Sequence, residues 1–534
     1  MSRLTHFALL IISLAAALAL WYATPAGLGL TNDSVAYIGG ARSIMAGTGY
    51  SDIWLDSSLE PITHYPPLLS LTLSGLGLLG LDPLRGARLL NIFLFGANTF
   101  LVGLLGWRMT RSQPSAFLLA LLFALNATFL RLHAYALSEP LFLFFSLLSF
   151  LFFDFSFNAP ASLRITRYSL LVTGFLASLA FLTRYSGLAL IATFAFALFL
   201  YQPDWRSRFT KIAQFLAGAV LPMSAWFIRN ALVAESATNR TFQFHPIQAE
   251  NLVPVFYNLS QFLMPVEDWR RALVKSGLIN WILVFAGLSL LTWLVFQAYR
   301  LIFHRPVSLP GNLPFTTSLY VFAYLGAILF SMSFFDASTK FQPRILAPLY
   351  VSGMLLLVGL LNFVHGTHGK VRIFSFDFSV FLRLIRVPII LLIAILALGL
   401  STFDFRLTLA ELRDSAGLGY GSWKWRDSIV MADLKNLSAD TAIYTNTPPA
   451  VYLVTGRASR VIPTTLDPVD NLPRNDYEQN LAQMRADLLA GRAVLALFDT
   501  SNIEEALGAE NVDQFISGLV VLQKAQGDVL YGKP

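Results

Sequence analysis

Long apolar segments recur through roughly the first 400 residues of this chain, and they constrain its fold more than any other feature. Most are about 17 to 22 residues long, the length that an α-helix needs to cross the hydrocarbon core of a bilayer. They lie at residues 5–24, 87–106, 115–131, 140–156, 168–183, 187–202, 212–228, 278–297, 317–334, 345–364 and 387–402. The sequence therefore predicts a polytopic α-helical membrane protein with about 11 transmembrane helices.

The first apolar segment also has to be distinguished from a signal peptide. It is long, it carries Trp21 and Tyr22, and it lacks a convincing small-residue cleavage site. We therefore expect it to be the first membrane helix.

The distribution of charge agrees with a membrane protein. Only 13% of the residues are charged, whereas soluble globular chains carry about a quarter. Residues 403–534 hold 12 Lys and Arg against 17 Asp and Glu, a net charge of −5. Because the whole chain has a net charge of +7, residues 1–402 carry a net charge of +12. This positive excess lies between the apolar segments, where it orients a protein in the bilayer, and we expect no nucleic-acid partner. The chain has no cysteine, which excludes disulfides, thiolate nucleophiles and Cys-ligated metals.

Every second connection between the apolar segments is basic, as the positive-inside rule requires of cytoplasmic loops. The basic groups are Arg108 and Arg111; Arg164 and Arg167; Arg206, Arg208 and Lys211; Arg300 and Arg305; and Lys370, Arg372, Arg383 and Arg386. We therefore expect an integral protein of the bacterial inner (plasma) membrane with a cytoplasmic N-terminus. The outer side then receives loops 25–86 and 229–277, and residues 66–80 are expected to form a helix at the outer interface.

The last part of the chain has a different sequence pattern from the membrane domain expected at residues 1–402. Apolar stretches at 442–444, 451–454 and 493–498 are separated by turn sequences and by charged helical pieces such as 477–489. Residues 403–534 are therefore predicted to form a soluble extracytoplasmic α/β domain.

Two carboxylates are expected at the outer surface. Asp33 directly follows the first segment, and Glu139 begins the fourth. Each has a structural interpretation, because Asp33 with Ser34 can cap the next helix and Glu139 suits a helix N-terminus. If the two carboxylates meet, they can instead share a proton, hold a divalent metal ion or orient an acceptor hydroxyl.

Cationic side chains are scarce on the expected outer side, and they are candidates for binding an anionic lipid phosphate. Arg184, Lys340 and Arg344 lie there, although arginines at a membrane edge also snorkel to lipid headgroups. His64 and Tyr65 precede two prolines in the first outer loop and are further candidates for binding substrate.

Several short motifs, taken in order, resemble those of the GT-C membrane glycosyltransferases, a superfamily that includes protein O-mannosyltransferases and lipid A aminoarabinose transferases. They are Asn32-Asp33 with Ala36-Tyr37 and Ala41, His64-Tyr65-Pro66-Pro67-Leu68, residues 85–91, Ala136-Leu137-Ser138-Glu139-Pro140, residues 183–188, residues 344–349, and in the tail residues 443–446 and 451–457. The resemblance therefore extends over most of the chain.

The resemblance implies a GT-C type fold and an inverting transfer of a sugar from a polyprenyl-phosphate donor to an acceptor hydroxyl of a lipid, glycan or protein on the extracytoplasmic face. Asp33 would then be the base, and Glu139 matches the second acidic position. Arg184 and Arg344 match outer-side cations that would face the lipid phosphate. Well-known members often carry paired acids in the first loop, whereas Asn32 and Ser34 flank Asp33 here. No cofactor is certain, and a divalent metal ion between Asp33 and Glu139 stays open.

The alternative from another functional class is a polytopic transporter or a lipid flippase for a glycoconjugate. Such proteins keep functional charges near the middle of the membrane and often show broken helices in paired halves. Here the segments are nearly free of charge and the polar residues gather on one side, which favours the transferase.

Overall fold

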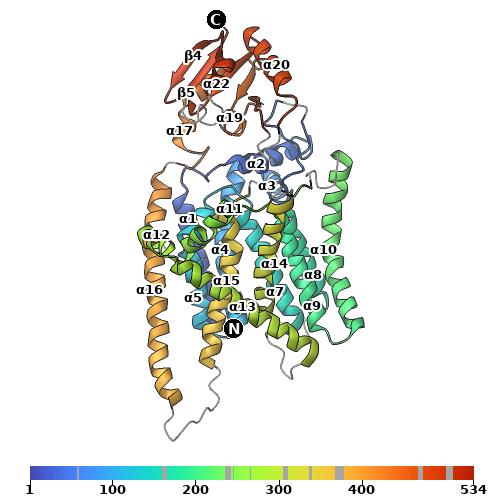
Figure 1. Cartoon of the computed structure of the whole chain (residues 1–534), viewed down its shortest axis with the longest axis vertical. Coiled ribbons are helices and arrows are strands. Elements are labelled where there is room, and N and C mark those ends of the chain that lie inside the picture. The colour runs from blue at the N-terminus through green and yellow to red at the C-terminus, as the bar shows by residue number, and fades with distance from the viewer. Residues whose placement is uncertain are drawn as a thin grey trace.

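The computed structural model describes residues 1–56, 59–158, 165–234, 242–244, 246–264, 266–304, 311–335, 339–366, 378–415, 417–466, 473–500 and 509–533. A bundle of long helices forms most of the molecule, and a small domain that contains a β-sheet stands on one end of it (Figure 1). The N-terminus lies toward the other end of the bundle. The sheet domain and the N-terminus are therefore separated along the longest axis.

Eight helices in the described part are long and apolar enough to cross a membrane. They are α1 (Arg3–Ala23), α4 (Pro83–Thr110), α7 (Glu139–Asn158), α10 (Trp205–Val233), α13 (Leu278–Tyr299) with its π-helical extension (Arg300–His304), α14 (Asn312–Phe334), α15 (Pro343–Gly366) and α16 (Phe378–Asp414). The helix α16 continues without a break through residue 402 to Asp414. These elements make the chain a polytopic α-helical protein.

The remaining predicted segments also fall on helices, but the predicted count of about 11 crossings is not confirmed. The helices α8 (Ile165–Thr183) and α9 (Leu188–Tyr201) are apolar yet short over their described parts. The segment predicted at 115–131 is not one helix: α5 (Gln113–Ala124) and α6 (Ala127–His133) are bent by 59°. The cause is Asn126, whose side-chain oxygen accepts from the amides of Thr128 and Phe129 and so starts a new helix.

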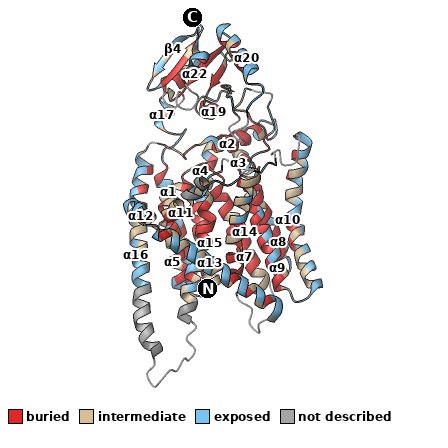
Figure 2. Ribbon diagram, viewed as in Figure 1, coloured by how far each residue is buried: buried red, intermediate tan, exposed pale blue. Residues whose placement is uncertain are grey.

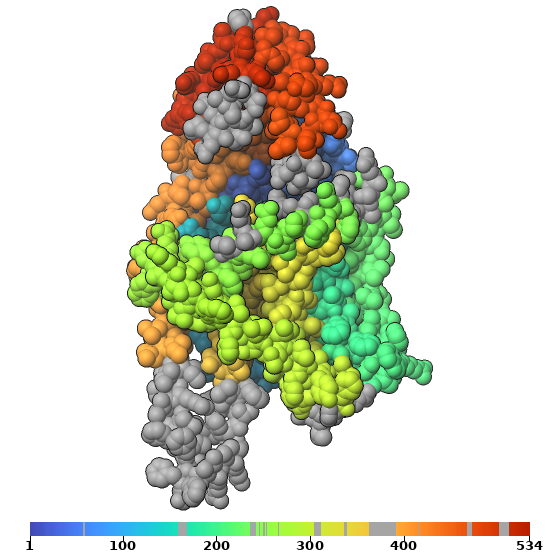
Figure 3. All heavy atoms as spheres, viewed as in Figure 1, coloured from blue at the N-terminus to red at the C-terminus, as the bar shows by residue number. Residues whose placement is uncertain are grey.

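Two short helices lie at the end of the bundle beneath the sheet domain, α2 (Asn32–Met45) and α3 (Leu68–Gly77) (Figure 1). The start of α2 is capped by Thr31 and Ser34, since the Thr31 amide donates to Ser34 Oγ over 2.9 Å. Asp33 is therefore not needed as the cap. The helices α11 (Ala249–Leu263) and α12 (Glu267–Lys275) come from the outer loop predicted at 229–277 and cross one face of the bundle (Figure 3).

Burial follows the arrangement expected of a bundle in lipid. Buried residues concentrate where the helices face one another, and the outward faces are exposed (Figure 2). Large apolar side chains lie on those outward faces, such as Leu4 (77% exposed), Trp281 (75%) and Phe285 (74%). An apolar surface of this kind suits contact with lipid tails.

The terminal domain has the predicted α/β organisation. Its five strands, β1 (Ala442–Thr445), β2 (Arg460–Val461), β3 (Ala493–Leu497), β4 (Val520–Ala525) and β5 (Asp528–Gly532), pair in the order β2-β1-β3-β5-β4. Strand β1 is parallel to β2 and β3, and β5 is antiparallel to β3 and β4. The domain also contains α17 (Trp423–Arg426), α18 (Ile429–Asn436), α19 (Pro448–Thr455), α20 (Tyr477–Leu489) and α22 (Ala509–Ile516).

Alternate residues of the central strands point to the two faces of the sheet. Tyr444 and Leu495 pack with Met484 of α20, whereas Ile443 and Val494 belong to the cluster that contains residues of α18 and α19. Helices therefore cover both faces, and the buried residues of these two clusters all come from the terminal domain.

Candidate active site

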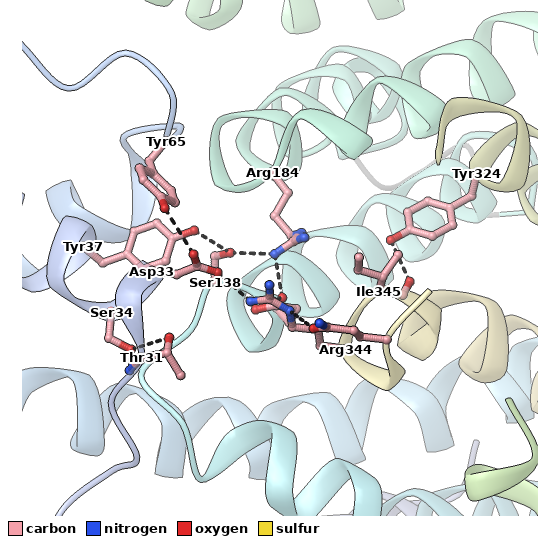
Figure 4. Close-up of polar contacts among 12 residues, drawn as sticks. Thr31, Asp33, Ser34, Tyr37, Tyr65, Ser138, Arg184, Tyr324, Arg344 and Ile345 are labelled. Carbon is pink, nitrogen blue, oxygen red and sulfur yellow. Dashed lines mark hydrogen bonds and ion pairs between the residues drawn. The ribbon is translucent and has the colours of Figure 1, made fainter. Parts of the chain in front are cut away.

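Four charged residues that are far apart in the sequence are joined by ion pairs. Figure 4 shows Asp33, Arg184 and Arg344 side by side. Arg344 Nη1 lies 2.5 Å from Asp33 Oδ2, and Arg184 Nη1 lies 2.6 Å from Glu139 Oε1. Arg344 Nη1 is also 3.9 Å from Glu139 Oε1, which joins the two pairs. We call Asp33, Glu139, Arg184 and Arg344 the charged cluster.

Each member of the charged cluster stands at a helix end. Asp33 is in the first turn of α2, Glu139 begins α7, Arg344 is the second residue of α15, and Arg184 directly follows α8 before the 3-10 turn Tyr185–Gly187. At such positions the chain leaves the helix bundle, so a charged side chain can lie near solvent while the helix fixes its backbone. The fold therefore places these four charged side chains where helices of the bundle begin or end.

The two ion pairs differ in how far solvent reaches them. The side chains of Asp33 and Arg344 are 27% and 32% exposed, whereas that of Glu139 is only 3% exposed. Glu139 Oε2 is buried and has no hydrogen-bond partner among the described residues. A substrate can therefore reach Asp33 and Arg344, while Glu139 lies behind them with Arg184.

Two tyrosines and a serine form further hydrogen bonds around the charged cluster. Tyr65 donates to Asp33 Oδ1 over 3.1 Å, and Tyr37 donates to Ser138 Oγ over 3.0 Å. Arg184 Nη1 donates to the same Ser138 Oγ over 3.1 Å. Burial, and then the nearby Asp33 carboxylate, raises the pKa of Tyr65, so its phenol remains protonated and donates to Asp33.

Sequence reasoning did not assign Tyr37 and Ser138 as site residues, although both lie in motifs that it singled out. A signal was present, because Tyr37 follows Asp33 by four positions and residues spaced in this way share one face of a helix. Ser138 precedes Glu139 directly. Their positions in the sequence relative to Asp33 and Glu139 could therefore have identified Tyr37 and Ser138 as polar neighbours of the two carboxylates.

Two other candidates lie outside these contacts. Lys340 is exposed and forms no ion pair with the carboxylates of the charged cluster in the part of the chain that the structure describes. His64 is also exposed, and its Nδ1 lies 3.4 Å from Thr63 Oγ1. Of the substrate-binding candidates, the structure therefore brings Arg184, Arg344 and Tyr65 to the two carboxylates.

Two asparagines of α4 hold the backbone on both sides of Glu139. Asn91 Nδ2 donates to the carbonyls of His133 and Tyr135 over 2.9 and 2.7 Å. Asn98 Nδ2 donates to the carbonyl of Pro140 over 3.0 Å. These bonds explain how a carboxylate in a buried setting keeps a fixed place beside Arg184.

The charged cluster does not fit a divalent metal ion. Two guanidinium groups lie beside the two carboxylates, so positive charge is already supplied where a cation would bind. Groups of three or more potential ligands from His, Asp and Glu are also absent from the described residues.

Asp33 and Arg344 line a cavity of about 880 Å³. Its walls come from α2, α6, α15, α16 and the α11–α12 region. The lining also includes Arg131, Arg270 and Asp404 together with apolar residues of α16. Arg131 pairs with Glu411 over 2.5 Å. The cavity therefore combines the Asp33–Arg344 pair with walls of mixed polarity.

Comparison with known proteins agrees with this architecture. Residues 62–269 match the model of the family described as dolichyl-phosphate-mannose-protein mannosyltransferase. The matched residues make up less than half of the chain. No curated protein sequence matches.

Solved structures resemble the whole chain. ArnT from Cupriavidus metallidurans in the apo state has a TM-score of 0.60 at 14% identity, with 99% of this chain and 98% of ArnT covered. The same protein bound to undecaprenyl phosphate gives 0.58 at 14% identity, covering 98% and 97%. The oligosaccharyltransferase of Archaeoglobus fulgidus, tethered to an acceptor peptide, gives 0.58 at 12% identity, covering 100% of this chain and 74% of the other.

The helical bundle with its terminal sheet domain gives this chain the fold of the GT-C membrane proteins. The predicted fold class is therefore confirmed apart from the number of crossings.

Proposed function

We propose that this protein is an inverting glycosyltransferase that moves a sugar from a polyprenyl-phosphate donor to an acceptor hydroxyl. The observation that carries the proposal is the charged cluster, in which an accessible carboxylate and two arginines meet beside a cavity. A base for a hydroxyl and cations for a departing phosphate are the two requirements of this reaction. The GT-C fold and the family match support the same class of enzyme.

In the proposed reaction Asp33 accepts the proton of the acceptor hydroxyl. The hydroxyl oxygen forms a bond to the anomeric carbon while the bond from that carbon to the phosphate oxygen breaks. The bonding electrons leave with the polyprenyl phosphate. Tyr65 and Arg344 occupy one site on each Asp33 oxygen, and each oxygen of an ionised carboxylate has a second lone pair, so the acceptor hydroxyl can still be bound.

Arg344 is the arginine best placed to receive the departing phosphate. Its guanidinium is one-third exposed, and it has several N–H donors in a planar fork that matches phosphate oxygens. When the donor binds, Arg344 divides its N–H donors between Asp33 and the phosphate. One guanidinium therefore links the base to the departing group.

Glu139 acts in this proposal through Arg184. Its side chain is buried and bonded to Arg184, so it does not face the cavity that Asp33 lines. Glu139 is therefore a positioning residue that keeps Arg184 charged and oriented behind Arg344. Asp33 is the accessible carboxylate of the charged cluster, and this supports a single displacement with inversion.

We also propose that the charged cluster lies on the extracytoplasmic face of a bacterial inner membrane. The basic connections predict this orientation, and the N-terminus and the sheet domain lie toward opposite ends of the molecule (Figure 1). A reporter that is active only outside the cytoplasm, fused after the last residue, should be active. A stable fusion with an inactive reporter would show that the protein has the opposite orientation.

The activity can be tested with the full chain reconstituted in liposomes that contain labelled polyprenyl-phosphate sugars and candidate acceptors. Transfer should release polyprenyl phosphate and give a product of opposite anomeric configuration, read by nuclear magnetic resonance. A product of retained configuration would overturn the single displacement. Movement of intact donor across the bilayer without cleavage would instead identify a flippase, the alternative from the transport class.

A further inference from the structure

We propose that the segment Leu418–Tyr420, which leads into the sheet domain, is a positioning element of the active site. It holds the chain directly before Asp33 and so couples the terminal domain to the base. This inference goes beyond the proposed function and relies on it only for a kinetic readout.

Three chain segments pair side by side beneath the sheet domain. The Gly29 amide donates to the carbonyl of Ala134 over 2.8 Å, and the Ala136 amide donates back to Gly29 over 2.9 Å. On the other side, the Leu30 amide donates to Leu418 over 3.1 Å and the Tyr420 amide donates to Leu30 over 2.9 Å. Both pairings are parallel bridges, so residues 29 and 30 form the middle of a minimal three-stranded arrangement.

This arrangement contains the approaches to both carboxylates. The middle segment ends three residues before Asp33, and the segment at 134–136 ends three residues before Glu139. The third segment follows α16 and precedes the first helix of the terminal domain, α17. The backbone position of Asp33 therefore depends on a segment that lies more than 380 residues later in the sequence.

Glycines make the close approach of the segments possible. Gly419 has a φ of +55°, and a Cβ there would lie 2.1 Å from the carbonyl oxygen of Leu30. A Cβ at Gly29 would lie 2.5 Å from the Tyr135 ring. Backbone cannot yield as a flexible side chain can, so a side chain at residue 419 must separate the segment from Leu30.

Side chains reinforce the connection between the terminal domain and the first outer loop. Tyr420 Oη donates to Asn32 Oδ1 over 2.5 Å, directly beside Asp33. Farther out, Arg460 Nε lies 2.9 Å from Asp56 Oδ2 and the Ser459 amide donates to Trp54 over 3.1 Å. The domain therefore holds this loop near its start and near its middle.

The test uses the full chain with Gly419→Ala and, as a matched control, Gly456→Ala. Gly456 also has a positive φ, +76°, and lies in the terminal domain, but a Cβ there would meet no atom within 4 Å. Gly419→Ala should raise the hydrogen-exchange rates of the Leu30 and Tyr420 amides at least ~10-fold, because these two amides form the pairing that opens. The same variant should lower kcat at least ~10-fold while the KM for the donor changes less than ~2-fold, as expected when a base is misplaced. Gly456→Ala should match the wild type in both measurements.

A second variant applies if Gly419→Ala does not fold. Tyr420→Phe keeps the ring and removes only the bond to Asn32, so kcat should fall by about 2- to 10-fold. In an Asn32→Ala background it should cause no further loss, because the two changes remove the same interaction.

Two results would overturn the inference: unchanged exchange and kcat in Gly419→Ala, or additive losses in the Tyr420 and Asn32 pair. If the wild type transfers no sugar, the proposed function fails. The exchange measurement still decides the coupling in that case.

Discussion

Replacing Asp33 by Asn should separate the chemical role of this residue from its structural role. Asn has the same size and keeps an oxygen that accepts the hydrogen bond from Tyr65, but it cannot take up the proton of a hydroxyl. Loss of a general base lowers rates by about 10²- to 10⁴-fold, equivalent to about 3 to 5 kcal/mol in the activation barrier. The initial rate of sugar transfer in liposomes should fall by this factor.

The effect of Asp33→Asn on stability should be much smaller. The ion pair with Arg344 joins side chains that are 27% and 32% exposed, and pairs that solvent reaches contribute at most about 1 kcal/mol. The thermal unfolding midpoint should therefore stay close to that of the wild type. A loss of activity combined with retained stability would identify a chemical role.

Asp82→Asn is the matched control for this experiment. Asp82 also pairs with an arginine at the same end of the bundle, since Arg42 Nη2 lies 3.0 Å from its Oδ1. Its side chain is 44% exposed and caps α4, a role that Asn fills equally well. Asp82→Asn should retain activity. A rate for Asp33→Asn within ten-fold of the wild type, or an equal loss in Asp82→Asn, would refute the assignment of Asp33 as the base.

Three further predictions follow from other contacts. Glu139→Gln removes the charge opposite Arg184, so kcat/KM for the donor should fall about 10- to 100-fold. The unfolding midpoint should also drop, since breaking a buried pair costs about 3 kcal/mol. An unchanged kcat/KM for the donor would contradict the positioning role. Asp154→Asn breaks the buried pair with Arg108 and should lower stability by a similar amount, while the activity per folded molecule, measured after purification, stays at the wild-type value. Burial and then Glu60 raise the pKa of Asp52 to about 6. Because the folded state prefers the protonated form, stability should fall as the pH rises through 6, and Asp52→Asn, followed by thermal unfolding at pH 5 and pH 7.5, should abolish that fall.

The sequence was most informative about residues that are rare in their surroundings. A charge next to an apolar segment stands out, and this is how Asp33, Glu139, Arg184 and Arg344 could be selected before their contacts were known. Their pairing could not be predicted, because Arg344 is 311 positions from Asp33 and the tilt of several helices decides which carboxylate it meets. Contact partners depend on packing over the whole bundle.

Other features escaped prediction because a local signal was overruled by a distant contact. The apolar segment predicted at 387–402 ends where charged residues become frequent, yet α16 continues to Asp414, and its Glu411 pairs with Arg131 of α6. Asp154 lies inside a segment judged nearly free of charge, and it is buried against Arg108. In both cases the charged residue forms an ion pair with another helix, and the local sequence does not reveal that partner.

The break at Asn126 has a consequence for the shape of the cavity. The Asn126 side chain starts α6 and also donates to the Phe262 carbonyl of α11. The turned helix supplies Ala127, Thr128 and Arg131 to the cavity wall. One wall of the cavity thus depends on an amide within an apolar stretch, outside the charged cluster. A substitution at this bend can therefore reshape the cavity and leave the four charged residues in place.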